Sequence, residues 1–197
     1  MQLKAEKVSF AYKKGVQILN QVDFVVNSGE VVGLTAPSGF GKTTLARILA
    51  GYEKPASGLV TLDGSPLPKS GYNPVQLIFQ HPEKAVNPKW KMRRVLEETG
   101  GYTAESLHQM GIMPEWLERW PRELSGGELQ RFCVLRVLNE RTRFIIADEM
   151  TTMLDAVTQA QIWNTVLDFA KKHDIGIVAI SHERDLLEAV CTRIERL

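Results

Sequence analysis

Glycines, a lysine and two threonines lie close together in the sequence APSGFGKTT, after the apolar run EVVGLT and before a helical pattern. Gly39 and Gly41 let backbone N–H groups approach an anion because no Cβ is in the way. The positive end of the next helix would attract that anion, Lys42 can reach the β- and γ-phosphates of a nucleotide, and Thr43 can offer a hydroxyl to Mg²⁺. The spacing predicts a phosphate-binding loop. Its predicted nucleotide contacts are Pro37, Ser38, Gly39, Phe40, Gly41, Lys42, Thr43 and Thr44.

One position of this loop departs from the usual pattern G-x-x-x-x-G-K-[ST], because Ala36 stands where the first glycine is expected. The residue before a proline favours extended backbone, which alanine adopts without strain, so we expect Ala36 to leave the loop functional. The alternative interpretation is a tight strand-to-helix turn with a solvated lysine. Kinases, GTPases and motor ATPases all use such a loop, so the loop alone leaves the reaction open.

Two carboxylates follow a second apolar run, FIIADE. A strand that ends at this point would deliver Asp148 and Glu149 to the carboxyl edge of a sheet, where α/β folds bind ligands. Asp148 suits Mg²⁺, which keeps several waters and accepts few carboxylates. Glu149 is then placed to orient and deprotonate an attacking water. A polar strand terminus without function is the alternative for either acid taken alone.

A third motif, LSGGELQR, places small residues before another helical pattern. Ser125, Gly126 and Gly127 would form a second anion-binding helix terminus. The chain would then have two anion-binding sites, this one and the phosphate-binding loop, for a single nucleotide. We expect that the second site covers the γ-phosphate held by the loop of another copy, which predicts a dimer that closes on ATP.

The elements that must position these residues alternate between short apolar strands and longer amphipathic helices. Such alternation implies a mostly parallel sheet with helices on both faces. From Pro82 to about Pro121 the strands give way to short helical pieces with three tryptophans, which suggests a helical insert. The expected strands are 30–35, 58–64, 75–80, 143–149 and 175–181, and the expected helices include 42–51, 126–139, 155–172 and 183–191.

Length, net charge and the distribution of apolar residues indicate the number of domains and argue against nucleic-acid binding, membrane spans and secretion. At 197 residues the chain is expected to form one domain, or one domain with an insert. The net charge of +1 gives no basis for a nucleic-acid partner, which usually requires a basic face. The longest apolar runs are far shorter than the roughly 20 residues of a transmembrane helix, and the N-terminus does not read as a signal peptide.

The motifs and their order resemble those of the ATP-binding subunits of ABC transporters over essentially the whole chain. The match consists of PSGFGKTT (Walker A), LIFQ (the Q-loop), LSGGELQR (the signature), IIADE (Walker B), TTMLD (the D-loop) and AISHE (the switch histidine). The resemblance implies a P-loop NTPase fold of the ABC ATPase type: a mostly parallel sheet core, an antiparallel β part and a helical subdomain. It implies a single domain 1–197, with a nucleotide-binding core at 1–82 and 139–197 and the helical subdomain at 83–138.

The resemblance also assigns roles to residues outside the loop. Gln80 would contact Mg²⁺ and relay to a membrane subunit, His182 would contact the γ-phosphate, and Tyr12 would stack on adenine. Glu149, His182 and Gln80 are therefore the expected catalytic residues, and Thr43, Gln80 and Asp148 the expected Mg²⁺ ligands. ATP and Mg²⁺ are the implied cofactors.

The implied function is ATP hydrolysis that drives an importer. The segment LIFQHPEKAVNPKWKM is most similar to the ATPases of peptide and nickel importers. The implied partners are transmembrane permease subunits and a second ATPase subunit, identical or different, at the cytoplasmic face of the membrane. Ala36, Met150 and Met153 depart from the family pattern, so a regulatory partner with weak hydrolysis stays open as an alternative. A second alternative is an ABC ATPase without a role in transport, although the sequence has neither the long coiled coils nor the tandem cassettes expected of one.

Overall fold

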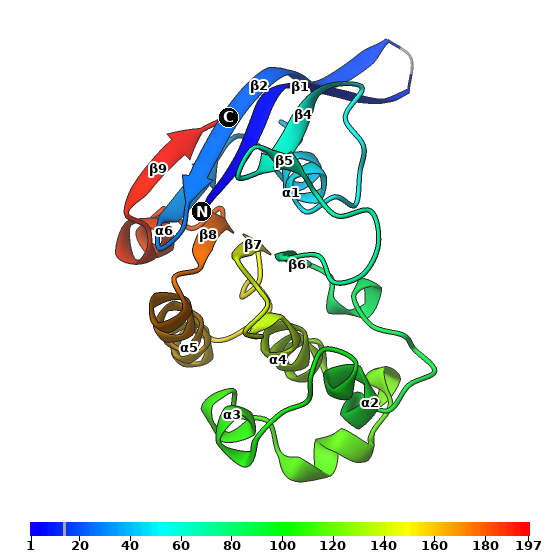
Figure 1. The fold of residues 1–197 in the computed structure, drawn as a ribbon. Coiled ribbons are helices and arrows are strands. Elements are labelled where there is room, and N and C mark those ends of the chain that lie inside the picture. The colour runs from blue at the N-terminus through cyan, green and yellow to red at the C-terminus, as the bar shows by residue number, and fades with distance from the viewer. Residues whose placement is uncertain (14) are drawn as a thin grey trace. The chain divides into compact units, whose positions relative to one another are not determined.

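The structure is a computed structural model that describes residues 1–13 and 15–197. It consists of two compact units (Figure 1). Unit 1 contains residues 1–77, 141–148 and 173–197, and unit 2 contains residues 78–140 and 149–172. The predicted helical subdomain, 83–138, lies in unit 2 together with residues 149–172, and its separation from the rest of the chain stays a prediction.

A five-stranded sheet carries four of the apolar runs, in the order β6-β7-β8-β3-β9. The pairs β7–β8, β3–β8 and β3–β9 are parallel, which confirms the mostly parallel sheet. Every residue of β7 and β8 is buried, as is typical of apolar runs in parallel sheets. The strands are β3 (Val31–Thr35), β6 (Val75–Ile78), β7 (Phe144–Asp148), β8 (Gly176–Ile180) and β9 (Arg193–Arg196).

A four-stranded antiparallel sheet with the order β2-β1-β4-β5 forms the other β part of unit 1. Long strands β1 and β2 pair along most of their length, and β4 pairs with the other edge of β1. This sheet confirms the antiparallel part of the predicted fold. Its strands are β1 (Gln2–Lys13), β2 (Val16–Asn27), β4 (Ser57–Leu62) and β5 (Ser65–Pro66).

Two helices belong to unit 1. Helix α1 (Lys42–Leu49) follows β3 and contacts both β7 and β1. Leu45, Ala46, Ile48 and Leu49 are buried, so its apolar face anchors the predicted phosphate-binding loop that precedes it. Helix α6 (Arg184–Val190) follows β8 and contacts β9.

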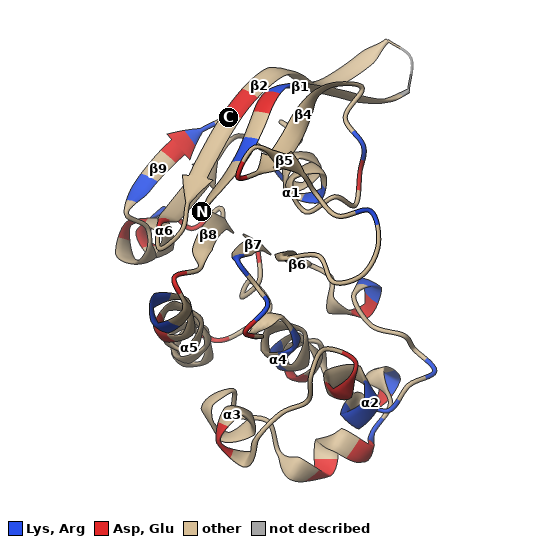
Figure 2. Ribbon diagram, in the orientation of Figure 1, with Lys and Arg blue, Asp and Glu red and all other residues tan. Residues whose placement is uncertain are grey.

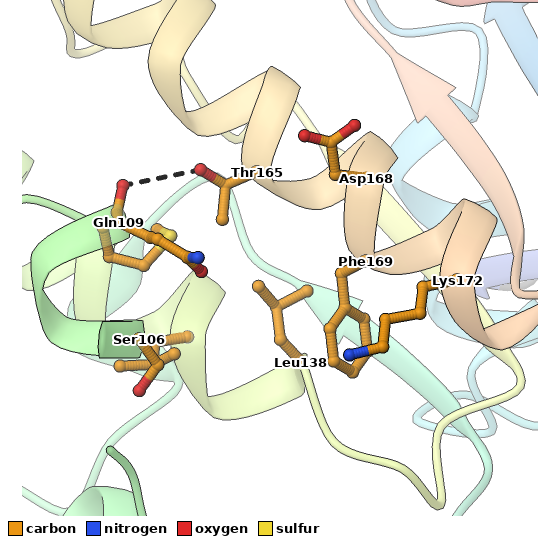
Figure 3. Close-up of a pocket in the computed structure, with 9 residues that line it drawn as sticks. Ser106, Gln109, Leu138, Thr165, Asp168, Phe169 and Lys172 are labelled. Carbon is orange, nitrogen blue, oxygen red and sulfur yellow. Dashed lines mark hydrogen bonds between the residues drawn. The ribbon is translucent and has the colours of Figure 1, made fainter. Parts of the chain in front are cut away.

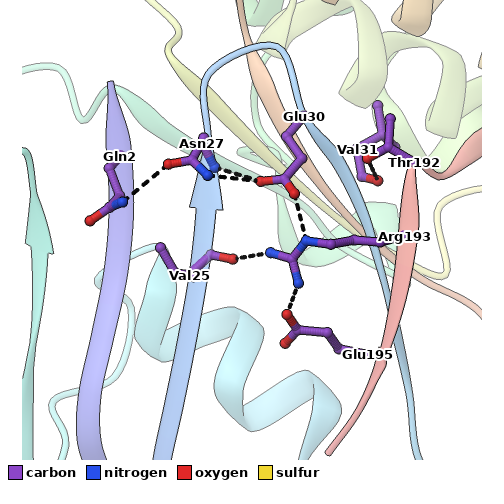
Figure 4. A network of polar contacts seen from close by, with 8 residues as sticks. All are labelled: Gln2, Val25, Asn27, Glu30, Val31, Thr192, Arg193 and Glu195. Carbon is purple, nitrogen blue, oxygen red and sulfur yellow. Dashed lines mark hydrogen bonds and ion pairs between the residues drawn. The ribbon is translucent and has the colours of Figure 1, made fainter.

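Strand β9 was not predicted, because its sequence RIER contains a single apolar residue. Polar contacts hold it instead (Figure 4). Arg193 Nε donates to Glu30 Oε1 at 2.5 Å, Arg193 Nη2 donates to Val25 O at 2.6 Å, and Arg193 Nη1 pairs with Glu195. The backbone amide of Asn27 donates to Glu30 Oε2 at 2.9 Å. The partners of Arg193 near the other end of the chain, Glu30 and Val25, lie 163 and 168 positions away, so these contacts cannot be predicted from a local pattern.

Unit 2 consists of helices, most of them short. Arg131 on α4 connects the residue after α3 with α5. Its Nη1 donates to Met110 O at 2.7 Å, and its Nη2 donates to Thr158 Oγ1 of α5 at 3.2 Å. The α-helices are α2 (Met92–Glu97), α3 (Ala104–Gln109), α4 (Gly126–Val137) and α5 (Ala156–His173), and the 3₁₀ helices are η1 (Pro82–Lys84), η2 (Pro114–Glu118) and η3 (Pro121–Glu123).

A cavity of about 310 Å³ lies among α3, α4 and α5 (Figure 3). Leu138 and Phe169 form part of its apolar wall, and Thr165 Oγ1 donates to Gln109 O at 3.4 Å beside it. Asp168 and Lys172 of α5 line it as well.

Charges of both signs are distributed over the two units (Figure 2). Within the described part of the chain, no helix combines the length and the apolar character needed to cross a membrane. The expectation that nucleic acid is not a partner stays a prediction.

Candidate functional site

The loop between β3 and α1 has the backbone that its glycines predict. Gly39 and Gly41 have φ angles of 83° and 93°, in the left-handed region that favours glycine. A Cβ at Gly41 would lie 2.7 Å from Leu19 Cδ2 and 3.0 Å from Ile18 Cγ2, so β2 also excludes a side chain there. Gly41 is the N-cap of α1 and no side chain caps this helix, so its first amides remain available to an anion.

Lys42 folds back onto the loop. It is only 7% exposed, and its Nζ donates to Ala36 O at 2.7 Å and to Pro37 O at 3.4 Å. The predicted phosphate ligand is therefore held by the carbonyl groups of its own loop. Its ammonium group is positioned within the loop that a nucleotide phosphate would occupy.

Tyr12 lies beside α1. The residue is 55% exposed, and its ring packs edge-on against Phe10, with ring centroids 4.9 Å apart. Its hydroxyl is 3.3 Å from Thr44 Oγ1, on the helix that follows the loop. An exposed aromatic face fixed next to a phosphate loop can stack on a base, an interaction worth about 1–3 kcal/mol per base.

Thr43 and Asp148 supply oxygen atoms suited to Mg²⁺. Thr43 is the second residue of α1 and Asp148 the last residue of β7, and these two elements are in contact. Asp148 is 3% exposed. A hydroxyl and a single carboxylate are the sparse protein ligand set that Mg²⁺ accepts when phosphate oxygens and water complete the shell. These residues therefore fit the ion.

Gln80 and Glu149 meet in unit 2. Gln80 Nε2 donates to Glu149 Oε2 at 2.6 Å, across 69 positions of sequence. Glu149 has a φ angle of 49°, which is uncommon for a residue with a side chain and is found where surrounding structure imposes it, often at functional sites. Glu149 directly follows Asp148, the last residue of β7.

His182 lies at the end of β8, beside the beginning of the phosphate-binding loop. It lines a cavity of about 580 Å³ with Ala36 and Pro37. Arg184 and Arg196 line this cavity too, and neither was identified from the sequence. Arg196 was missed because it belongs to the unpredicted strand β9.

The signature residues begin α4, as expected, and they also form a capping box that was not predicted. Ser125 Oγ accepts from the Glu128 amide at 3.2 Å, and Glu128 Oε2 accepts from the Ser125 amide at 2.7 Å. This reciprocal capping box satisfies two backbone donors and adds a negative charge to the first turn. The S-x-x-E spacing could have revealed it. The anion-binding role of Ser125, Gly126 and Gly127 stays a prediction.

A cavity of about 510 Å³ opens at these signature residues. Trp116, Met153 and Leu154 give it apolar walls, and a Cβ on Gly126 would lie 3.3 Å from Met153 Sδ. Asp155 lies at its edge; the amide of Thr158, which donates to the Asp155 carboxylate, lowers the pKa of this group below 3.8. We call this cavity the signature pocket.

The sequence profile of the family described as ABC transporter matches residues 19–152. The chain belongs to the ABC transporter family. As an ABC ATPase, it binds and hydrolyses ATP.

Known relatives and a solved structure are similar to the chain over most of its length. It is 32% identical to the nickel import ATP-binding protein NikE of Rhodospirillum rubrum over 198 residues, covering 90% of this chain and 71% of the relative. It is 33% identical to the probable D,D-dipeptide transport ATP-binding protein DdpF of Escherichia coli, covering 91% and 60%. A dimeric bacterial ABC transporter cassette has the same fold, with a TM-score of 0.85, 23% identity and coverage of 99% and 94%.

Proposed function

We propose that this ABC ATPase powers an importer for peptides or for nickel and related metal complexes. The relatives with the names quoted above support this class of cargo. The assignment of ATP hydrolysis to Glu149 rests on its hydrogen bond with Gln80. This bond holds the Glu149 carboxylate in place, one residue after Asp148 at the end of β7. A fixed carboxylate at this point can act as the base for an attacking water.

The loop and its neighbours are proposed to bind the nucleotide. Tyr12 stacks on adenine, the amides of residues 37–44 bind the phosphates, and Lys42 exchanges its contact with Ala36 O for phosphate oxygens. Thr43, Asp148 and Gln80 would hold Mg²⁺, which neutralises phosphate charge when bound. His182 is proposed to contact the γ-phosphate. Glu149 accepts the proton of the water.

The proposed partners follow from the signature motif. Residues 125–127 would cover the γ-phosphate held by the loop of a second subunit, so that two nucleotides lie between two subunits. The second subunit is either another copy of this chain or a related ATPase. Transmembrane permease subunits, contacted by the helical subdomain 83–138, would place the pair at the cytoplasmic face of the membrane.

Replacing Glu149 tests the catalytic assignment. We expect Glu149→Gln to lower the rate of ATP hydrolysis by about 10²–10⁴-fold, because an amide keeps the shape of the side chain but cannot accept the proton. ATP binding should persist. The measurement is phosphate release at saturating ATP, together with ATP titration.

The matched control is Glu105→Gln, an exposed glutamate in the first turn of α3, which should hydrolyse ATP at the parent rate. Turnover of Glu149→Gln within a few-fold of the parent would refute the assignment.

A further inference from the structure

The backbone of Glu149 has a conformation that its surroundings must impose. Its φ angle of 49° lies in the left-handed region, which a residue with a Cβ rarely adopts. The hydrogen bond from Gln80 holds the carboxylate of Glu149 but does not act on its backbone. The carbonyl of Glu149 accepts hydrogen bonds from the hydroxyl and the amide of Thr152, at 3.1 Å and 3.4 Å, so the chain turns at this point. Whatever holds this turn also sets the direction of the Glu149 side chain.

Thr151, two residues after Glu149, is anchored to helix α5. It is buried, and its Oγ1 accepts two hydrogen bonds from this helix. Gln159 Nε2 donates at 2.9 Å and Trp163 Nε1 donates at 3.3 Å. Trp163 is buried as well, and a buried indole N–H requires an acceptor within the protein. One buried oxygen atom thus joins the turn to two positions of α5 that lie one helical turn apart.

The end of the same segment is fixed to the first turn of α5. Asp155 Oδ1 accepts from the amides of Val157 and Thr158, at 3.1 Å and 3.0 Å, and so caps the helix. Residues 149–155 are therefore held by Gln80 at one end and by this cap at the other. Between these two points, the Thr151 hydroxyl joins the segment to the body of α5.

We propose that Thr151, held by Gln159 and Trp163, positions the Glu149 carboxylate for ATP hydrolysis. The inference rests on the proposed role of Glu149 as the base. The three residues are positioning residues, because they act on Glu149 through the backbone of residues 149–151. A base must lie within hydrogen-bond reach of the water that it activates, and a displacement of about 1 Å can lower a rate by about 10²-fold. Loss of the Thr151 hydroxyl would let the left-handed backbone at Glu149 relax and would move the carboxylate.

Replacement of the Thr151 hydroxyl by a methyl group tests the proposal. Thr151→Val keeps the shape of the side chain and removes the acceptor. We expect kcat for ATP hydrolysis to fall by about 10- to 100-fold, with KM and ATP affinity within about twofold of the parent. Thr151→Ser retains Oγ1 and should recover most of the parent kcat. The measurement is phosphate release over a range of ATP concentrations, at a temperature at which circular dichroism shows each variant to be folded.

The matched control is Thr165→Val. Thr165 belongs to the same helix, and its hydroxyl donates to Gln161 O at 3.0 Å. This variant loses a hydroxyl from α5 but should keep the parent kcat, because the contact lies outside residues 149–155. An equal loss of kcat in Thr165→Val and Thr151→Val would show a general loosening of α5 and would overturn the proposal.

A second experiment tests the hydrogen bond from the other side. Trp163→Phe removes the donor and keeps a ring in the core, so kcat should fall by about threefold to tenfold, less than in Thr151→Val, because Gln159 still donates to Thr151. The double variant Thr151→Val/Trp163→Phe should be about as slow as Thr151→Val alone, since both changes break the same contact. Losses that multiply fully, or a parent-like kcat in Trp163→Phe, would overturn the proposal.

The result for Glu149→Gln separates this inference from the proposed function. If Glu149→Gln loses hydrolysis while Thr151→Val keeps the parent kcat, or while Thr151→Ser is as slow as Thr151→Val, Glu149 stays the base and the positioning role is wrong. If Glu149→Gln hydrolyses ATP within a few-fold of the parent, the catalytic assignment fails, and the positioning role fails with it.

Discussion

Ala36 and Gly41 stand at opposite ends of the phosphate-binding loop, and the backbone makes different demands on them. Gly41 has a φ angle of 93° and no room for a Cβ, whereas the φ angle of Ala36 is not positive. The carbonyl of Ala36 accepts a hydrogen bond from Lys42, a contact that any residue type could provide through its backbone. The loop therefore requires glycine at position 41 and not at position 36.

We expect Ala36→Gly to leave ATP affinity nearly unchanged and to lower the free energy of unfolding by about 0.4–1 kcal/mol, because glycine increases the entropy of the unfolded chain. Gly41→Ala should weaken ATP binding at least tenfold, since alanine disfavours this φ by about 1–2 kcal/mol and its methyl group would displace Leu19 or the loop. ATP titration and thermal melts measure both effects. A tenfold gain in affinity from Ala36→Gly would contradict this view and favour the regulatory alternative.

At the scale of elements, the sequence predicts what local patterns encode. Strands β3, β7 and β8 are continuous apolar runs, and α1 and α5 have helical periodicity, so their existence could be predicted. The hydrogen bond between Gln80 and Glu149, 69 positions apart, was not predicted, because the resemblance gave these residues separate roles. Strand β9 was missed because the contacts of Arg193 hold it. The capping box at Ser125 was visible in the spacing but was interpreted only as an anion site.

The ion pair that holds β9 predicts a pH dependence of stability. Burial alone would raise the pKa of Glu30, but hydrogen bonds from Arg193 and from the Asn27 amide outweigh it and lower this pKa below 4.5. Because the pKa is lower in the folded state, the stabilisation is present above the unfolded value and is lost as the pH falls through the folded value.

Arg193→Gln should therefore lower the free energy of unfolding by about 1–3 kcal/mol at pH 7, and by clearly less at pH 3. Urea unfolding at both pH values measures the difference. Glu6→Gln is the control, because the ion pair of Glu6 with Lys4 is exposed and its loss should change stability by about 0–1 kcal/mol. An equal loss for Arg193→Gln at both pH values would show that packing, and not charge, holds β9.

At the scale of the whole molecule, we expect ATP to bind the folded chain and not the unfolded chain, and so to raise the free energy of unfolding. The proposed nucleotide contacts come from β1, from the loop before α1 and from the ends of β7 and β8, segments far apart in sequence. The unfolded chain cannot assemble them. ATP should therefore stabilise the native state by an amount that rises with the logarithm of its concentration above the dissociation constant.

Thermal unfolding of the Glu149→Gln chain, which keeps ATP intact, measures this linkage. At a free ATP concentration about 100 times the dissociation constant, we expect a stabilisation of about 2.7 kcal/mol, or a rise in Tm of about 5–11 °C for a chain of this size. Lys42→Ala in the same background should abolish most of the rise, because it removes the cation held at Ala36 O and Pro37 O. The comparison uses the ATP-induced rise within each variant, since Lys42→Ala also changes the Tm without nucleotide. An undiminished rise in Lys42→Ala would place the ATP elsewhere than in this loop.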